Sequence, residues 1–185
     1  MLKTISILVD NEAGVLARVT NLFSRRGYNI DSLAVGTTDV PSESRITVRV
    51  ECDARVLEQI IYQVGKLVCV HKIKILDGDS QVSRELTLIK VRANAAVRGE
   101  IIQIAEVFRA RIVDLTPEAM TIELTGDGGK TDALLDMLRP YGVVEMARTG
   151  IVALDRGLAS ISDSPFTFNS GNRGGNGGQT PVSLV

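Results

Sequence analysis

The chain has 185 residues, 44% of them hydrophobic, with 21 basic and 22 acidic side chains and a formal net charge of −1. A chain of this length forms one domain or two small ones. The near-neutral charge argues against a nucleic-acid binder, whose affinity depends on a basic surface. No apolar run is long enough to span a bilayer, and the first residues reach Asp10 too soon for a signal peptide. These features predict a cytoplasmic globular protein that binds neither nucleic acid nor a membrane.

Three side chains that often carry chemistry are predicted to be structural. Cys52 and Cys69 are too few for a disulfide framework, and we expect buried thiols in or beside strands. The single histidine, His71, falls inside a predicted strand without a serine, aspartate or cysteine partner at a catalytic spacing. The GDGGK segment at 126–130 lacks the ending of a phosphate loop and is predicted to be a strand-to-helix turn. The sequence therefore predicts no catalytic residue and no metal site in this chain.

The first 76 residues alternate between strand and helix patterns. Residues 3–9 alternate between apolar and polar side chains as in a strand, and helical spacing follows as far as Phe23. We expect Arg25, Arg26 and Gly27 to end this helix, because cations are favourable in a last turn and glycine takes the left-handed conformation after it. The later patterns predict strands at 29–36 and 45–51, a helix at 56–64 and a strand at 68–76. The predicted order is β-α-β-β-α-β.

The same order recurs after a polar, glycine-containing segment at 77–83, where we place a domain boundary. The patterns predict a strand at 84–93, a helix at 97–108, strands at 111–115 and 119–125, a helix core at 132–138 and a strand at 143–147. The predicted fold class is α+β, with two consecutive ferredoxin-like βαββαβ domains at 1–77 and 84–157, each with helices on one face of an antiparallel sheet. Residues 158–185 include the glycine-rich SGNRGGNGGQ, which favours a disordered tail over an RGG-like nucleic-acid segment.

The segment from Asn11 to Ile30 carries the candidate binding site. A glycine turn that leads into a helix leaves backbone N–H groups free at the helix start, where they can bind a carboxylate. The turn alone is explained equally well as structure, with Asp10 or Asn11 capping the helix and Gly14 allowing close packing. Asn29 favours binding, because its amide offers a donor and an acceptor to an α-amino acid. No nucleophile or general base lies nearby, so the segment is predicted to bind a small anion-bearing molecule without transforming it.

Several motifs carry a resemblance to a known family. N-E-x-G-x-L-x-R-V from residue 11 and R-G-Y-N-I-x-S-L from residue 26 are similar to an ACT domain. The second half is similar to the C-terminal domain of the acetolactate synthase (acetohydroxyacid synthase) small subunit in RELTLIKV, IVDLTPEAMTIELTG, GKTDALL and EMARTGIVALDRG. Residues 1–157 thus resemble this regulatory subunit. The second-half motifs are the more specific, since ACT domains occur on many enzymes.

The resemblance implies that ACT domains pair side by side into a homodimer, which binds valine or another branched-chain amino acid at its interface. The effector-binding residues it implies are Asn11, Gly14, Val15 and Leu16 of one chain and Asn29 and Ile30 of the other. This fits their chemistry, because helix-start N–H groups can face a carboxylate and apolar residues can enclose a branched side chain.

The resemblance also implies a partner and a function. The partner is the large catalytic subunit, on which thiamine diphosphate (ThDP), Mg²⁺ and FAD are expected, while this chain binds no cofactor. The implied function is to activate that subunit, which makes acetolactate from two pyruvates in branched-chain amino acid biosynthesis, and to confer feedback inhibition.

Two other classes of function are open. A stand-alone ACT-type amino-acid sensor would regulate a different metabolic enzyme, and the resemblance of the second domain argues against it. A ferredoxin-like nucleic-acid binder is expected to carry exposed aromatic residues and basic flanks on a central strand. The strands ITVRV and TLIKV contain no aromatic residue and no excess of basic ones. The sequence therefore favours the regulatory subunit.

Overall fold

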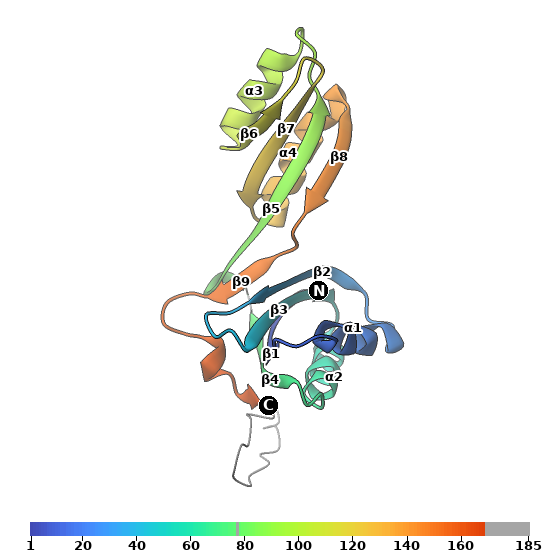
Figure 1. Cartoon of the computed structure of the whole chain (residues 1–185), viewed down its shortest axis with the longest axis vertical. Helices are drawn as coiled ribbons and strands as arrows, with labels where there is room; N and C mark the ends of the chain where they lie inside the picture. The colour runs from blue at the N-terminus through green and yellow to red at the C-terminus, as the bar shows by residue number, and fades with distance from the viewer. Residues whose placement is uncertain (77, 169–185) are drawn as a thin grey trace. The chain divides into compact units, whose positions relative to one another are not determined.

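The computed structural model describes residues 1–76 and 78–168, and the chain divides into two compact units (Figure 1). Of the described residues, unit 1 contains those of 1–82 together with 153–168, and unit 2 contains 83–152. Each unit has an antiparallel sheet with helices packed on one face. The predicted α+β class with two ferredoxin-like units is confirmed.

Unit 1 follows the predicted order of strands and helices. Its elements are β1 (Leu2–Asp10), α1 (Val15–Arg25), β2 (Ile30–Thr37), β3 (Glu43–Glu51), α2 (Ala54–Val64) and β4 (Val70–Leu76), followed by a short 3₁₀ helix, η1 (Gly78–Ser80). The strand order in the sheet is β10-β4-β1-β3-β2, with every pair antiparallel. The sheet therefore places β2 at one edge.

The core of unit 1 forms where every second side chain of a strand points to the face of the sheet that the helices cover. Ile5 and Ile7 of β1 point to the face that α1 and α2 cover, and both are fully buried. Val19 and Phe23 of α1 pack in the same core cluster as these two side chains. Burying each such side chain contributes about 1.5–3 kcal/mol. Two further core residues are the free cysteines, as predicted, and burial raises the pKa of the Cys52 thiol.

Unit 2 repeats this architecture. Its elements are β5 (Gln81–Arg92), α3 (Arg98–Val107), β6 (Arg111–Leu115), β7 (Ala119–Gly126), α4 (Gly128–Leu138), the 3₁₀ helix η2 (Arg139–Tyr141) and β8 (Val143–Arg148). The strand order is β6-β7-β5-β8. Ile89 and Ile122 of the central strands pack against Ile101 of α3 and Leu134 of α4.

Two local predictions in this half are refined. The GDGGK segment is a strand-to-helix turn, and α4 begins before its predicted core because the Asp127 side chain accepts a hydrogen bond from Lys130 N at 2.8 Å. The predicted linker at 77–83 is partly ordered, since β5 begins at Gln81 and pairs with β9 (Val152–Asp155). Arg156 N also donates to Ser80 O at 2.8 Å. Because this segment is polar, its sequence did not predict that β5 begins within it.

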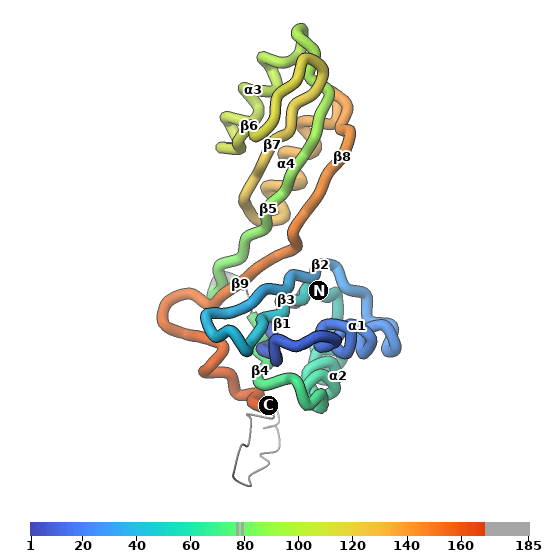
Figure 2. Tube along the Cα trace, in the orientation of Figure 1, coloured from blue at the N-terminus to red at the C-terminus, as the bar shows by residue number. Residues whose placement is uncertain are grey.

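The predicted boundary after residue 157 is wrong for the part of the chain that the structure describes. Residues 153–168, here named the C-terminal arm, belong to unit 1 and contain η3 (Ile161–Asp163) and β10 (Phe166–Thr167). Figure 2 shows the arm returning to end beside β4, where Phe166 lies opposite Ile73. Phe166 is buried in the core of unit 1. The rest of the predicted disordered tail, 169–185, lies outside the described residues.

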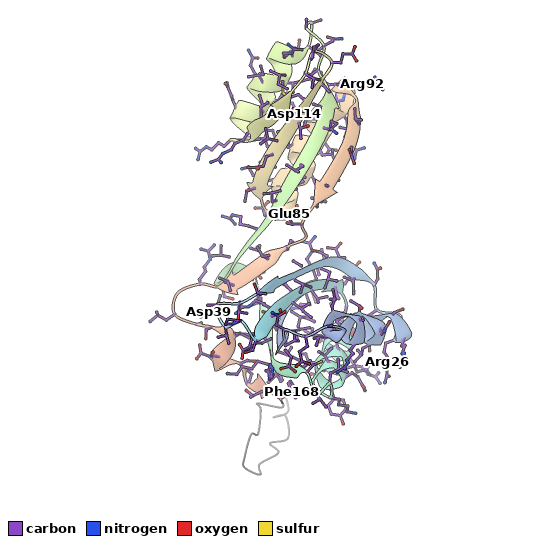
Figure 3. All side chains as sticks on the ribbon, in the orientation of Figure 1. Arg26, Asp39, Glu85, Arg92, Asp114 and Phe168 are labelled. Carbon is purple, nitrogen blue, oxygen red and sulfur yellow. The ribbon has the colours of Figure 1, made fainter. Side chains whose placement is uncertain are left out.

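A second aromatic residue anchors the end of the arm. The Phe168 ring, labelled in Figure 3, packs against Gly65. A Cβ added at Gly65 would lie 2.3 Å from the ring atom Cε1. Phe168 N also donates a hydrogen bond to His71 O at 2.6 Å. These contacts fix the arm although its sequence has no apolar periodicity.

Candidate functional site

The turn between β1 and α1 is open, as a binding turn requires. Gly14 is the N-cap of α1 with φ +84°, and no side chain caps the helix. A left-handed φ of this kind is a conformation that favours glycine. Asp10 does not cap the helix but lies 2.8 Å from His71 Nε2 through its Oδ1 atom. The capping role considered for Asp10 or Asn11 is therefore not observed, and the first-turn N–H groups of α1 have no side-chain acceptor.

Asn11 holds the loop between β2 and β3. Its Nδ2 donates to Pro41 O at 2.9 Å, and its Oδ1 accepts from Ser44 Oγ at 3.0 Å. Its backbone N also donates to Ser42 O at 2.8 Å. The Nδ2 group carries a second hydrogen that these contacts leave available. Asn11 thus positions the loop. One Nδ2 hydrogen stays available for its predicted contact with a ligand.

The predicted apolar residues at the start of α1 point in different directions. Val15 is 4% exposed and belongs to the core, so its side chain does not face a ligand at the surface. Leu16 is 41% exposed. Of the predicted pair, Leu16 thus exposes its side chain, whereas the Val15 side chain lies in the core and its backbone N donates to Glu12 O at 3.3 Å.

Asn29 is presented at the start of β2. Gly27 has φ +69°, as predicted for the helix end, and Tyr28 N donates to Phe23 O at 3.0 Å. The Tyr28 ring meets Phe23 edge-on, with centroids 6.2 Å apart. Asn29 itself is exposed, and within the described residues its amide makes no hydrogen bond. Ile30 is partly buried against the core. The Asn29 amide is therefore available to a ligand.

The two groups of predicted site residues lie at opposite ends of the sheet within one chain. Ile30 is opposite Val50, which pairs with Lys3 at the start of β1. Thr37 is opposite Ser44, which pairs with Val9 at the end of β1. The eight residues of β2 span about 23 Å. Because Gly14 follows the end of β1 and Asn29 precedes the start of β2, one chain does not bring them together.

The β2–β3 loop is a neighbour of the candidate turn that sequence reasoning missed. Thr38 Oγ1 donates to Val40 O and accepts from Val40 N, both at 3.1 Å, and the loop also carries Asp39, labelled in Figure 3. Asn11 fixes the far side of the same loop. The only sequence signal was the cluster of turn-forming residues between two strands.

The sheet edge beside these residues is open. β2 is the terminal strand of the unit 1 sheet, whereas at the other side β4 is covered by β10. Val35 of β2 is 46% exposed. A free edge strand presents unpaired backbone N–H and C=O groups that can pair with another strand.

Other kinds of site receive no support from the described residues. They contain no group of three or more His, Cys, Asp and Glu side chains that could hold a metal ion. No described helix is long and apolar enough to cross a membrane.

The fold of unit 1, with its uncapped glycine turn and open β2 edge, defines a regulatory protein of the ACT class. Residues 5–72 match the model of the "AHAS small subunit-like ACT domain", in which AHAS stands for acetohydroxyacid synthase. Residues 84–157 match the model of the "small subunit of acetolactate synthase".

Relatives support the same assignment over nearly their whole length. The acetolactate synthase small subunit of Mycolicibacterium smegmatis is 52% identical over 158 residues, which is 85% of this chain and 93% of the relative. That of Mycobacterium leprae is 49% identical over 158 residues, 85% of this chain and 94% of the relative. The crystal structure of the Thermotoga maritima small subunit superposes with a TM-score of 0.81 at 42% identity, over 86% of this chain and 99% of that one.

The chain therefore belongs to the family of acetolactate synthase small subunits. This family acts in branched-chain amino acid biosynthesis as an allosteric, regulatory component. A small subunit implies a large catalytic subunit as its partner.

Proposed function

We propose that this chain raises the activity of the ThDP-dependent catalytic subunit of acetolactate synthase and makes it sensitive to inhibition by valine or another branched-chain amino acid. Family membership supports the choice of partner, and the geometry of unit 1 supports an effector site. The catalytic subunit joins two pyruvates to acetolactate with release of CO₂. In this proposal ThDP, Mg²⁺ and FAD are bound by that subunit.

The observation that carries the effector site is the separation of Gly14 from Asn29 along β2. Two copies of β2, paired antiparallel about a two-fold axis, place the start of one strand beside the end of the other. Asn29 of one protomer then approaches the start of α1 in its partner. The same pairing covers the free sheet edge of both copies. We therefore propose a homodimer through β2 that completes two equivalent effector sites.

Each group in this shared site has a distinct task. The effector carboxylate binds the first-turn N–H groups of α1, which no side chain caps. The free Asn29 amide from the other protomer contacts the polar atoms of the amino acid as donor and acceptor. Leu16 and Ile30 provide apolar surface for the branched side chain, and Asn11 keeps the neighbouring loop in place.

Inhibition requires that the effector favours one arrangement of the dimer over another. A coupling free energy of about 1–3 kcal/mol between two sites changes affinity by about 5–150-fold. An effector that binds across two chains meets this requirement, because its contacts depend on how the two protomers are placed.

Reconstitution tests the proposal. Acetolactate formation is measured with the catalytic subunit alone and with added small subunit, over a range of valine, leucine and isoleucine concentrations. We expect the small subunit to raise the rate and to introduce inhibition by at least one of the three. A rate and an inhibition curve unchanged by the small subunit would contradict the proposal.

A stand-alone ACT-type sensor for another enzyme is the second candidate, because unit 1 alone carries the effector site. The match of residues 84–157 to the acetolactate synthase small subunit argues for the first candidate. Purification of the tagged full-length chain distinguishes them. Recovery of a large ThDP-dependent protein supports the regulatory subunit, and recovery of a different enzyme without it supports the sensor.

A further inference from the structure

A cavity lies on the face of the unit 1 sheet that is opposite α1 and α2. Its volume is about 310 Å³, and it lies between the strands and the C-terminal arm and is partly open to solvent. The strands contribute Ser6, Arg45 and Lys74, and the arm contributes Asp155. This volume is at the lower end of the range for small-molecule sites, about 300–1,000 Å³. The cavity is separate from the predicted effector residues.

An unpartnered hydroxyl lines this cavity. Ser6 is 1% exposed, and its Oγ atom is buried without a hydrogen-bond partner in the described residues. Ser6 lies directly opposite Thr47 on one side and Lys74 on the other. A buried polar atom without a partner is unfavourable and rare in native proteins. A ligand atom in the cavity would satisfy it.

An unpaired cation lines the same cavity. Arg49, on the same strand and the same sheet face as Arg45, pairs with Asp31 at 2.5 Å. Lys74 pairs with Asp155 at 2.9 Å and donates to Ser160 O at 2.8 Å. The Arg45 guanidinium is partly buried and has no ion pair or hydrogen bond among the residues the structure describes. It therefore remains available for an anion.

The rest of the lining specifies the kind of anion. Arg45 and Lys74 oppose one carboxylate, Asp155, which leaves a single positive charge. Leu76 and Ile161 are buried at the wall, while Leu154 is 58% exposed. One positive charge, one hydroxyl and apolar walls match a monocarboxylate with a short apolar chain. They match phosphate less well, because its second charge has no counter-ion, and an amino acid less well, because Asp155 is already paired.

We propose that this cavity binds a small monocarboxylate with a short apolar chain, held by the Arg45 guanidinium and the Ser6 hydroxyl. The 2-oxo acids belong to this chemical class. Since the arm forms one wall, the bound ligand stabilises the docked arm. Binding at this site is independent of the proposed effector site and of dimer formation.

Calorimetric titration of the full-length chain tests the proposal, with 2-oxobutyrate, isovalerate, inorganic phosphate and valine as separate probes. We expect both monocarboxylates to bind and to slow hydrogen exchange in the arm. Arg45→Gln should weaken their binding about tenfold to a hundredfold, because a hydrogen bond to a charged group is lost. Arg45→Lys should recover part of the affinity. Arg49→Gln removes the same charge from the same strand and face but should change the affinity less than twofold.

Ser6→Ala separates ligand binding from a structural role. Removing an unsatisfied buried hydroxyl should raise the Tm of the ligand-free protein, while the affinity for 2-oxobutyrate falls. The proposal is overturned if neither monocarboxylate binds, if phosphate binds more tightly than both, or if Arg45→Gln and Arg49→Gln have equal effects. It is also overturned if Arg45→Gln weakens valine binding as much as 2-oxobutyrate binding, since the cavity would then be an amino-acid site.

Discussion

Units 1 and 2 share an order of elements but differ at the turn that opens their first helix. In unit 2, Asn94 Oδ1 accepts from Ala96 N at 3.0 Å and from Val97 N at 3.3 Å. The Arg98 guanidinium donates to the carbonyls of Thr116 and Pro117 at 3.1 and 2.8 Å. These side chains thus hold the turn and the neighbouring loop, although α3, whose N-cap is Val97, has no side-chain cap of its own. In unit 1, α1 also has no side-chain cap, and among the described residues no side chain accepts from the N–H groups of the turn at Gly14.

The difference supports the proposal that unit 1 binds the effector. Helix-start N–H groups are a ready site for an anion only when no side chain already occupies them. The difference therefore favours the proposed effector site in unit 1 over a second one in unit 2. The ferredoxin-like topology fixes where the turn lies. The residues in the turn determine whether its N–H groups are available to a ligand.

The largest expected effect concerns stability and separates the units. Phe166→Ala removes a buried side chain that the arm places in the core of unit 1. We expect a loss of about 3 kcal/mol from unit 1, within the range for buried phenylalanine. Hydrogen exchange should show faster opening of β1 and β4, while the exchange of β5 and β7 stays unchanged. Equal acceleration in both units would contradict the assignment of the arm to unit 1.

Gly14→Asp should abolish effector inhibition in the reconstituted enzyme and leave activation intact. A carboxylate at the helix start repels the carboxylate of the effector, and we expect a shift in the inhibitory concentration of about a hundredfold or more. Gly14→Asn is the matched control, because it has the same shape and shares the strain of the left-handed φ without the charge. If both variants lose inhibition equally, backbone strain and not charge explains the loss.

Asn29→His should weaken valine binding about tenfold to a hundredfold, because it removes an amide that pairs with charged groups and adds bulk. Calorimetry with the purified small subunit measures this directly. Native affinity in the variant would remove Asn29 from the site. Because Asn29 is exposed, the substitution should not unfold the protein. An unchanged Tm in thermal unfolding checks this.

The smallest expected effect concerns the turn before α3 in unit 2. Asn94→Ala should lower the stability of unit 2 by about 1 kcal/mol, because the turn before α3 loses the side-chain oxygen that accepts from its N–H groups. Valine affinity and inhibition should be unchanged. A change in either would mean that the unit 2 turn also takes part in effector binding.

The two βαββαβ units could be predicted because strands, helices and turns leave patterns among residues that are close in sequence. Alternation placed Ile5 and Ile7 in the core, and Gly27 ended α1 with the expected positive φ. The helix-start glycine was also predicted, and its open turn is observed. In these regions each residue adopts the structure that its neighbours in sequence favour.

The failures depend on contacts between distant residues. The hydrogen bonds of the Asn11 amide to Pro41 and Ser44 across a loop were not predicted. The ordered arm was missed because Phe166 and Phe168 anchor it by tertiary contacts within a polar segment. No periodic signal accompanies such anchors, so only the folded chain reveals them.

The central claim is that each effector site is shared by two protomers, and subunit complementation tests it most directly. Gly14→Asp and Asn29→His chains, each expected to lack native-affinity valine sites as a homodimer, are unfolded together, refolded as an equal mixture and titrated with valine. In a heterodimer, Gly14 of the Asn29→His chain meets Asn29 of the Gly14→Asp chain, so one site is intact. The account predicts that valine binding returns in the mixture with native affinity and reduced stoichiometry. No recovery from a mixture shown to contain heterodimers would contradict it.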